Sequence, residues 1–303
     1  DLALLAGSAG ITLALLSAAP IETGPVINTG YHLTARPWKP LNIPREKYLD
    51  VVEGVCRFSV RYQDATGAIL DPFAKREIQY ATPYFAYAVG ALVSAGHAVD
   101  LLPNGVSAMD HATTGFAGGR ATIPDNHGEF FIAALTEAIE LYAKQVPEQT
   151  LDIWRRRMRK PLSEVVRGSK NNWETYAMKG EWLRLQAGLV NRGDAVAAIE
   201  AAWRSRQRDH FASAPWFLYH DRSSDPDTLS VEAVGRGNLL ALIHAGYNGP
   251  SADEIRRDVE SGTRFTLLLQ DPTGQVPANG RTDDHVWVDV GYQLVFEVMA
   301  ERA

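Results

Sequence analysis

Four short segments of the sequence are rich in side chains that can move a proton or hold an anion. They span residues 118–127, 169–173, 219–227 and 271–285. Asparagine and arginine can neutralise a carboxylate through hydrogen bonds, whereas a neutral histidine or an ionised tyrosine can accept a proton. Together with the ring faces of tryptophan and tyrosine, these groups suit a carboxylated sugar. The candidates are Asn126, His127, Asn171, Asn172, Trp173, Tyr219, His220, Asn279, Arg281 and His285.

Each segment is followed by a stretch that is apolar on nearly every side and is predicted to be a helix. These stretches begin near residues 129, 172, 230 and 285, and in the first of them apolar residues recur at helical spacing. Amphipathic helices are predicted between them, at 151–162, at 196–208 and from 251 onward. Only 58–70 and 286–299 also fit strands, so a β-rich fold is not expected.

This alternation of buried and amphipathic helices determines the expected all-α fold. An apolar helix is buried on all sides, and an amphipathic helix covers a surface. Repeated hairpins of one buried and one outer helix describe either a double-shelled α/α toroid or an α-solenoid. The irregular spacing and the long loops favour the toroid. Its buried helices would run parallel, so their N-termini, whose free N–H groups favour an anion, would meet at one mouth.

The same residues have simpler structural interpretations, which stay open at this stage. Asn126, Asn171 and Asp227 can act as helix caps, and His127 and His285 can bond to loop backbone. The basic run 155–160 is expected to be the solvated face of an outer helix. Isolated histidines are expected to be structural, namely His97, His111 and His244.

No motif in the sequence indicates a metal or an organic cofactor. The aspartates in 225–227 and 283–284 could hold calcium, but no spacing of aspartates matches an EF-hand loop. The glycines at 118–119 are not followed by a phosphate-binding GxxxxGK[ST] pattern, and HExxH, CxxC and GxSxG are missing as well. We therefore expect neither a metal nor a cofactor.

Composition places the chain among ordinary globular proteins. It has 303 residues, of which 46% are hydrophobic and 22% charged, and this excludes wholesale disorder and a disulfide scaffold. The formal net charge of -6 argues against nucleic acid as a partner, because phosphate binding needs a positive surface. An acidic protein can still bind an anionic substrate in a local basic pocket. The lone Cys56 is expected to be a small buried hydrophobe.

The N-terminal region differs in composition from the rest of the chain. Residue 1 is Asp, and residues 2–19 form the longest apolar run, rich in small residues. We expect 1–19 to be an export signal, similar to the part of a twin-arginine signal just after its arginines, which places the protein in the periplasm or outside the cell. A single membrane anchor is the alternative. Residues 20–47 contain five prolines and form a lead-in, and no further membrane segment is expected.

Three runs of the sequence resemble the α/α-toroid polysaccharide lyases. This group often places an Asn-His pair at the start of an inner helix, and Asn126 and His127 stand in that position. The runs 123–131, 171–184 and 279–287 are similar to the branch that includes the L-rhamnose-α-1,4-D-glucuronate lyases. The resemblance covers roughly 80–303. It implies an incomplete α/α-toroid catalytic domain at 48–303, a fragment that lacks the C-terminal β-rich domain of such lyases.

The resemblance also implies β-elimination on an acidic polysaccharide or oligosaccharide. Asn126 would neutralise the uronate carboxylate, and His127 would take the proton next to it. From the converging loops, Arg281 is added as a further catalytic contact, and Tyr219 or His220 as the acid/base partner. Expected substrate contacts are Asn171, Asn172, Trp173, Asn279 and His285.

Two other functions remain open. A glycoside hydrolase on the same scaffold needs two carboxylates about 5–9.5 Å apart, and Asp125, Glu129 and Asp227 are the candidates. A non-catalytic α-solenoid would show an extended concave surface and no closed polar pocket. The residues at the mouth discriminate between the two enzymes, since a centre of Asn, His, Tyr and Arg indicates elimination and a carboxylate pair indicates hydrolysis.

Overall fold

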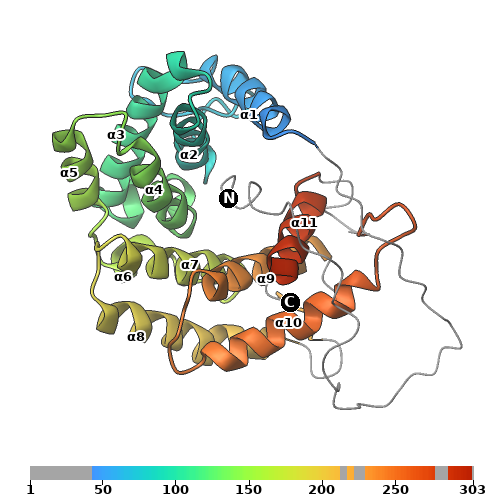
Figure 1. Cartoon of the computed structure of the whole chain (residues 1–303). Helices are drawn as coiled ribbons and strands as arrows, with labels where there is room; N and C mark the ends of the chain where they lie inside the picture. Colours follow the sequence, from blue (N-terminus) through green and yellow to red (C-terminus); the bar gives the residue numbers. More distant parts are fainter. Residues whose placement is uncertain (1–42, 212–216, 222–228, 277–285, 302–303) are drawn as a thin grey trace, which may run out of the picture.

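A computed structural model describes residues 43–211, 217–221, 229–276 and 286–301 (Figure 1). These residues form an all-α structure with three isolated β-bridges and no strand. The helices are α1 (Arg45–Val60), α2 (Ala81–Ser94), α3 (Leu102–Gly118), α4 (Glu129–Tyr142), α5 (Glu148–Arg157), α6 (Leu162–Val165), α7 (Trp173–Gln186), α8 (Arg192–Ala202), α9 (Leu229–His244), α10 (Ala252–Leu267) and α11 (Val286–Glu301).

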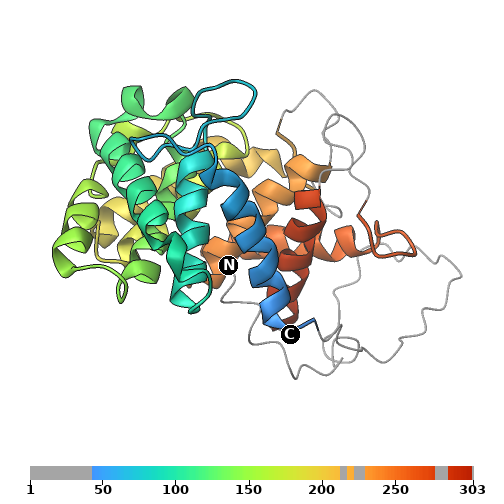
Figure 2. The ribbon, with the colours of Figure 1, turned by 90° about the horizontal axis from the view of Figure 1, so that it is seen from above.

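One row of helices forms the centre of the structure. Along it α1 contacts α2, α2 contacts α4, α4 contacts α7, α7 contacts α9, and α9 contacts α11. The other long helices pack on this row from outside, with α3 on α2, α5 on α3, α8 on α7 and α10 on α9. Figure 1 shows the row curving around the middle of the view, and Figure 2 shows α1, α2 and α3 side by side.

The predicted helix starts are confirmed for the buried-type helices. These begin at Glu129, Trp173, Leu229 and Val286, within two residues of the predictions. The strand alternative for 286–299 is wrong, because α11 covers that stretch, and 58–70 forms the end of α1 followed by turns. The amphipathic α5, α8 and α10 also match their predictions. Helix α1 begins at Arg45, inside the expected lead-in.

Helix α4 lies at the centre of the largest apolar core. Eleven of its fourteen residues are buried, and its neighbours α2 and α7 approach it closely. The approach to α7 depends on Gly180, because a Cβ there would lie only 2.5 Å from Ile132 Cγ2. On the other side, the hydroxyl of Tyr142 donates a hydrogen bond of 2.9 Å to the carbonyl of Ala86 in α2. Cys56, predicted to be a buried hydrophobe, is 1% exposed in the same core.

Helices α9, α10 and α11 are joined by a buried polar network. Arg236 of α9 is fully buried, forms an ion pair with Glu232 one turn earlier, and donates to the carbonyl of Val259 in α10. The hydroxyl of Tyr292 in α11 donates to Glu232 at 2.5 Å and to the carbonyl of Leu229 at 2.7 Å. The two charges therefore neutralise each other, and hydrogen bonds satisfy the groups around them.

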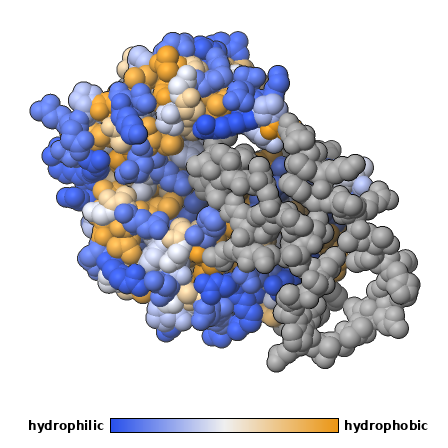
Figure 3. Space-filling model, in the orientation of Figure 1, coloured by the Kyte–Doolittle hydropathy of each residue, from blue (hydrophilic) through white to orange (hydrophobic). Residues whose placement is uncertain are grey.

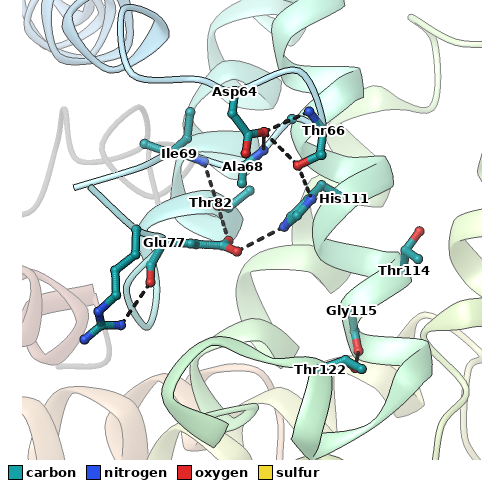
Figure 4. A network of polar contacts seen from close by, with 12 residues as sticks. Asp64, Thr66, Ala68, Ile69, Glu77, Thr82, His111, Thr114, Gly115 and Thr122 are labelled. Carbon is teal, nitrogen blue, oxygen red and sulfur yellow. Dashed lines mark hydrogen bonds and ion pairs between the residues drawn. The ribbon is translucent and has the colours of Figure 1, made fainter. Parts of the chain in front are cut away.

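A second polar network fastens the α1–α2 connection to α3 (Figure 4). His111 of α3 lies 3.0 Å from Thr66 Oγ1 through Nδ1 and 3.0 Å from Glu77 Oε2 through Nε2. Thr66 donates in turn to Asp64 at 2.7 Å, and Thr82 donates to the second oxygen of Glu77. Both ring nitrogens of His111 thus have partners, which confirms its predicted structural role.

The described surface and helices bear on the sequence expectations for the membrane. Figure 3 shows hydrophilic residues over α5 and α8, at the outer edge of the view. Among the described residues, no helix is both long enough and apolar enough to cross a membrane. The expected export signal at 1–19 and most of the expected lead-in at 20–47 lie outside the described residues.

Candidate active site

Residues at the starts of five helices line one groove, which we call the aromatic groove. It has a volume of about 610 Å³. Six aromatic rings line it, contributed by Tyr80, Tyr84, Phe130, Trp173, Tyr176 and Trp287, and its remaining lining residues are Gln79, Asn172, Ser230, Val231 and Val234. Five of the rings come from the first turns of α2, α4, α7 and α11, and Tyr80 directly precedes α2. The lining residues from α9 lie in its first two turns. The N-termini of these helices therefore meet at one end of the structure.

The rings of the groove hold one another in fixed positions. Phe130 packs edge to face against Tyr80 at 5.3 Å between centroids, against Tyr176 at 4.9 Å and against Trp173 at 5.9 Å. Such contacts each stabilise an arrangement beyond simple burial of the rings. The result is a rigid apolar wall with phenol hydroxyls and amides around it. A wall of this kind suits a ligand with apolar C–H faces and many hydroxyl groups, which is the chemistry of a sugar.

His127 lies directly behind this wall. Its ring is 3% exposed and packs edge to face against Trp173, with 4.3 Å between the ring centroids. Its Nδ1 atom lies 3.7 Å from Glu129 Oε1, and neither atom has a hydrogen-bond partner among the described residues. Glu129 is 1% exposed, and its other oxygen accepts from the backbone N–H of Arg167 at 3.4 Å.

Burial favours the uncharged forms of both His127 and Glu129. It lowers the pKa of His127, and the nearby positive charge of Arg167 lowers that pKa further. Burial also raises the pKa of Glu129 to about 6. At neutral pH the imidazole of His127 is therefore uncharged, which is the form that can accept a proton.

Asn126 lies at the surface, next to a backbone turn of unusual geometry. Asp125 and Asn126 have positive φ values of 54° and 60°, a conformation that these two residue types tolerate better than most. Asp125 accepts from Arg76 at 2.9 Å and from the backbone N–H of Gln79 at 3.3 Å. Since Gln79 lines the groove, Asp125 ties the Asn126 turn to its edge. The Asn126 side chain is exposed and makes no hydrogen bond with a described residue.

The second predicted segment lies at the groove as well. Asn172 is 7% exposed, lines the groove, and donates its backbone N–H to Asp221 Oδ1 at 2.5 Å. The side chain of Asn171 accepts from the backbone N–H of Trp173 at 3.2 Å and from the Ser169 hydroxyl at 2.7 Å. Asn171 therefore shapes the turn into α7 through a local side-chain bond. It is not the helix cap, because the N-cap residue of α7 is Asn172 and its side chain makes no capping bond.

The two predicted site residues in the described part of the third segment lie apart from the groove. Tyr219 is 1% exposed, donates from its hydroxyl to Gln207 Oε1 at 2.8 Å, and packs against Gly235 of α9. His220 pairs through its backbone N–H with the carbonyl of His210 at 2.6 Å. Neither Tyr219 nor His220 lines the groove, and the segment reaches the groove edge through Asp221, which accepts from the N–H of Asn172. The predicted residues Asn279, Arg281 and His285, and the carboxylate candidate Asp227, lie outside the described residues.

Several lining residues were not predicted from the sequence. Tyr80 and Tyr84 lie at the start of α2, a helix that the sequence reading did not identify, although residues 81–94 are as apolar as the other buried helices. Tyr176 stands in an apolar helix, which favours a core position, but it lines the groove. The apolar run at 81–94 is the signal for Tyr80 and Tyr84, because it predicts a buried helix whose first turn contains Tyr84 and follows Tyr80.

Comparisons with protein-family models, with curated proteins and with solved structures find no match to this chain. Within the described residues there is also no group of three or more His, Cys, Asp or Glu side chains placed to hold a metal ion.

Proposed function

We propose that the protein is a polysaccharide lyase that cleaves a uronic-acid glycan by β-elimination in the aromatic groove. One observation carries the proposal: a buried histidine with an unpartnered nitrogen, kept neutral by its surroundings, lies directly behind a wall of aromatic rings. The resemblance of the Asn126-His127 turn to the Asn-His pair of α/α-toroid lyases supports the same assignment. Linkages of the L-rhamnose-α-1,4-D-glucuronate type are the first substrates to test.

We further propose that the helix row is part of an incomplete α/α toroid. The succession of row helices, with α3, α8 and α10 packed outside α2, α7 and α9, and the meeting of helix N-termini at one groove both support this arrangement. With residues 1–19 as an export signal, the enzyme would act on acidic glycans in the periplasm or outside the cell.

Neither Asn126 nor His127 is among the residues that line the groove, so their proposed roles rest on the resemblance and on the contact of His127 with Trp173. Asn126 donates from its amide to the uronate carboxylate, together with the N–H groups of the helix starts, and this makes the adjacent C–H more acidic. His127 accepts that proton through its neutral imidazole. Because Trp173 covers His127, the Trp173 side chain has to move aside when the glycan binds. Arg281, Asn279 and His285 stay candidates for further substrate contacts.

The leaving oxygen needs a proton donor at the groove. Tyr219 and His220 were proposed for this role from the sequence, but neither lines the groove. Tyr176 does, and burial raises its pKa to about 12, which keeps the phenol protonated at neutral pH. We therefore assign the proton-donating role to Tyr176.

Hydrolysis is the second candidate, and the groove favours it less. The described lining of the groove contains amides, hydroxyls and rings but no carboxylate. Of the three candidate carboxylates, Glu129 is buried behind the wall, Asp125 is bound to Arg76, and Asp227 lies outside the described residues. A hydrolase needs two carboxylates facing the scissile bond.

The test is to incubate the protein with glucuronate-bearing polysaccharides and follow the ultraviolet absorbance of the unsaturated uronate. We expect His127→Ala to lower the rate by about 10²–10⁴-fold, as expected for loss of a general base. The matched control is His97→Ala, since His97 lies near Glu53 of α1, away from the groove. New reducing ends without this absorbance would show a hydrolase, and tight glycan binding without any product would show a non-catalytic binding protein.

A further inference from the structure

A second groove lies between α7, α8 and the segment 159–168, and we call it the arginine groove. Its volume is about 960 Å³, larger than that of the aromatic groove. Part of its lining is apolar and built from small residues, among them Ala177 of α7 and Ala198 and Ala201 of α8. Five arginines also line it, namely Arg120, Arg159, Arg167, Arg184 and Arg206.

Two of these arginines are neutralised inside the groove wall. Arg184 is fully buried and pairs with Glu181 at 2.7 Å, and Arg206 pairs with Glu174 at 2.6 Å. The third carboxylate of the lining, Asp194, stands at the first turn of α8. It accepts a hydrogen bond of 2.5 Å from the Asn191 amide, and its backbone N–H donates to Asn191 Oδ1 at 2.9 Å. None of these carboxylates pairs with Arg120, Arg159 or Arg167.

The other three arginines, Arg120, Arg159 and Arg167, have no carboxylate partner in the part of the chain that the structure describes. All three are exposed at the groove, and none forms an ion pair with a described residue. The chain as a whole carries a net charge of -6, so this concentration of positive charge runs against the overall balance. Guanidinium groups bind carboxylate and phosphate oxygens in a two-pronged geometry.

Residues of the groove wall also keep unused hydrogen-bonding atoms. Arg184 Nε, Arg206 Nε and Glu174 Oε2 are buried and have no partner among the described residues. Buried polar atoms in folded proteins normally have a partner, in the protein, in a ligand or in water. The wall is thus polar and incompletely satisfied at several points, whereas its apolar part leaves room that no side chain of the described residues fills.

We propose that the arginine groove binds a small organic oxyanion, with its phosphate or carboxylate group against Arg120, Arg159 and Arg167 and its apolar part on the alanine-rich lining. The arginines alone would suit an inorganic ion, but the apolar lining and the volume require a ligand with a carbon body. This site is distinct from the aromatic groove. Its existence does not depend on the proposed lyase activity.

The test is isothermal titration of the full chain with phenyl phosphate, benzoate and inorganic phosphate. We expect saturable binding of at least one organic anion, about tenfold or more tighter than inorganic phosphate. The better of phenyl phosphate and benzoate identifies the anionic group. Equal affinity for inorganic phosphate, or no saturable binding of either organic anion, would overturn the proposal.

The variant that tests the site is the double change Arg120→Gln with Arg159→Gln. Both side chains are exposed, so the fold should tolerate the change, and circular dichroism checks this. We expect the affinity to fall about tenfold or more, because charge-assisted hydrogen bonds are lost. The matched control is Arg156→Gln, an exposed arginine of α5 outside the groove, which should bind as the unchanged protein does. Equal affinity in the double variant would also overturn the proposal.

Discussion

From α1 to α4, the buried polar side chains are mostly threonines, whereas from α7 to α11 many of them carry charge. The first set is Thr82, Thr113 and Thr136, joined by His127 and Glu129 at the start of α4. The second set includes Glu174, Glu181, Arg184, Glu232, Arg236 and Asp258. The first part of the row therefore depends on close apolar packing, and the second depends on the pairing of buried charges.

This difference has an energetic meaning. A well-packed apolar interface becomes less stable when a substitution makes one of its side chains either larger or smaller. A buried ion pair is close to neutral as a unit, but it becomes very costly when one partner is removed. The two parts should therefore respond to opposite kinds of substitution.

The largest effect is expected at the α9–α11 network. Glu232→Ala leaves the fully buried Arg236 without its carboxylate, so we expect unfolding free energy to fall by about 3–5 kcal/mol. Denaturation in urea measures this loss. The double variant Glu232→Leu with Arg236→Met should lose much less, because no unpaired charge remains. Asp253→Ala, which breaks the exposed pair with Arg256, should change nothing measurable. If the double variant were less stable than Glu232→Ala, the loss could not be attributed to the unpaired charge of Arg236.

The next largest effect is expected at the α4–α7 contact. In Gly180→Ala the new methyl group would lie 2.5 Å from Ile132 Cγ2 and 3.0 Å from the backbone nitrogen of Ala133. Because backbone cannot move aside cheaply, we expect a loss of about 3 kcal/mol, the upper end for overpacking. The matched control is Gly54→Ala in α1, where no atom lies within 4 Å and alanine should raise stability by about 1 kcal/mol. A loss of similar size at both positions would show that the close contact with Ile132 and Ala133 is not what makes Gly180→Ala destabilising.

The sequence predicted the helices better than it predicted the site, and the reason lies in which side chains carry the signal. Apolar runs identified α4, α7, α9 and α11, because burial on all sides leaves a continuous apolar pattern. The same rule assigns Arg184 and Arg236 to a surface, since their partners Glu181 and Glu232 are recognised only once the helices are built. Because the helix starts were expected to meet at one mouth, Asn172 and Trp173 were predicted at the groove, and both line it. The location of Tyr219 depends on the path of the connection between α8 and α9, and hydrophobic periodicity does not predict the path of a connection.

A smaller, pH-dependent effect is expected at the start of α4. Burial raises the pKa of Glu129 from its usual 4.5 to about 6, so the folded state holds the proton more tightly than the unfolded state. Stability therefore falls as pH rises from about 4.5 to 6, and the penalty of about 2 kcal/mol persists above that range. Glu129→Gln removes this penalty and keeps an acceptor for the N–H of Arg167.

Urea denaturation across this pH range checks the Glu129 prediction. The difference in stability between Glu129→Gln and the unchanged protein should grow with pH and then level off. The pKa of His127 is shifted in both proteins, so its contribution largely cancels in the difference. A difference that shrinks as pH rises would contradict the burial of an uncharged Glu129.

The smallest effect is expected at His111, where the sign is opposite. The hydrogen bond to Glu77 raises the pKa of His111, so the folded state favours the imidazolium. Its contribution is fully present below about pH 6.5 and is lost as pH rises through the folded pKa. Since the His111 side chain is 29% exposed, we expect less than about 1 kcal/mol. In His111→Gln the stability deficit should therefore shrink between about pH 6 and 8, where the deficit due to Glu129 stays constant. A deficit that grows over this range would mean that the folded state keeps His111 neutral. The charge of His111 would then not stabilise the network of Figure 4.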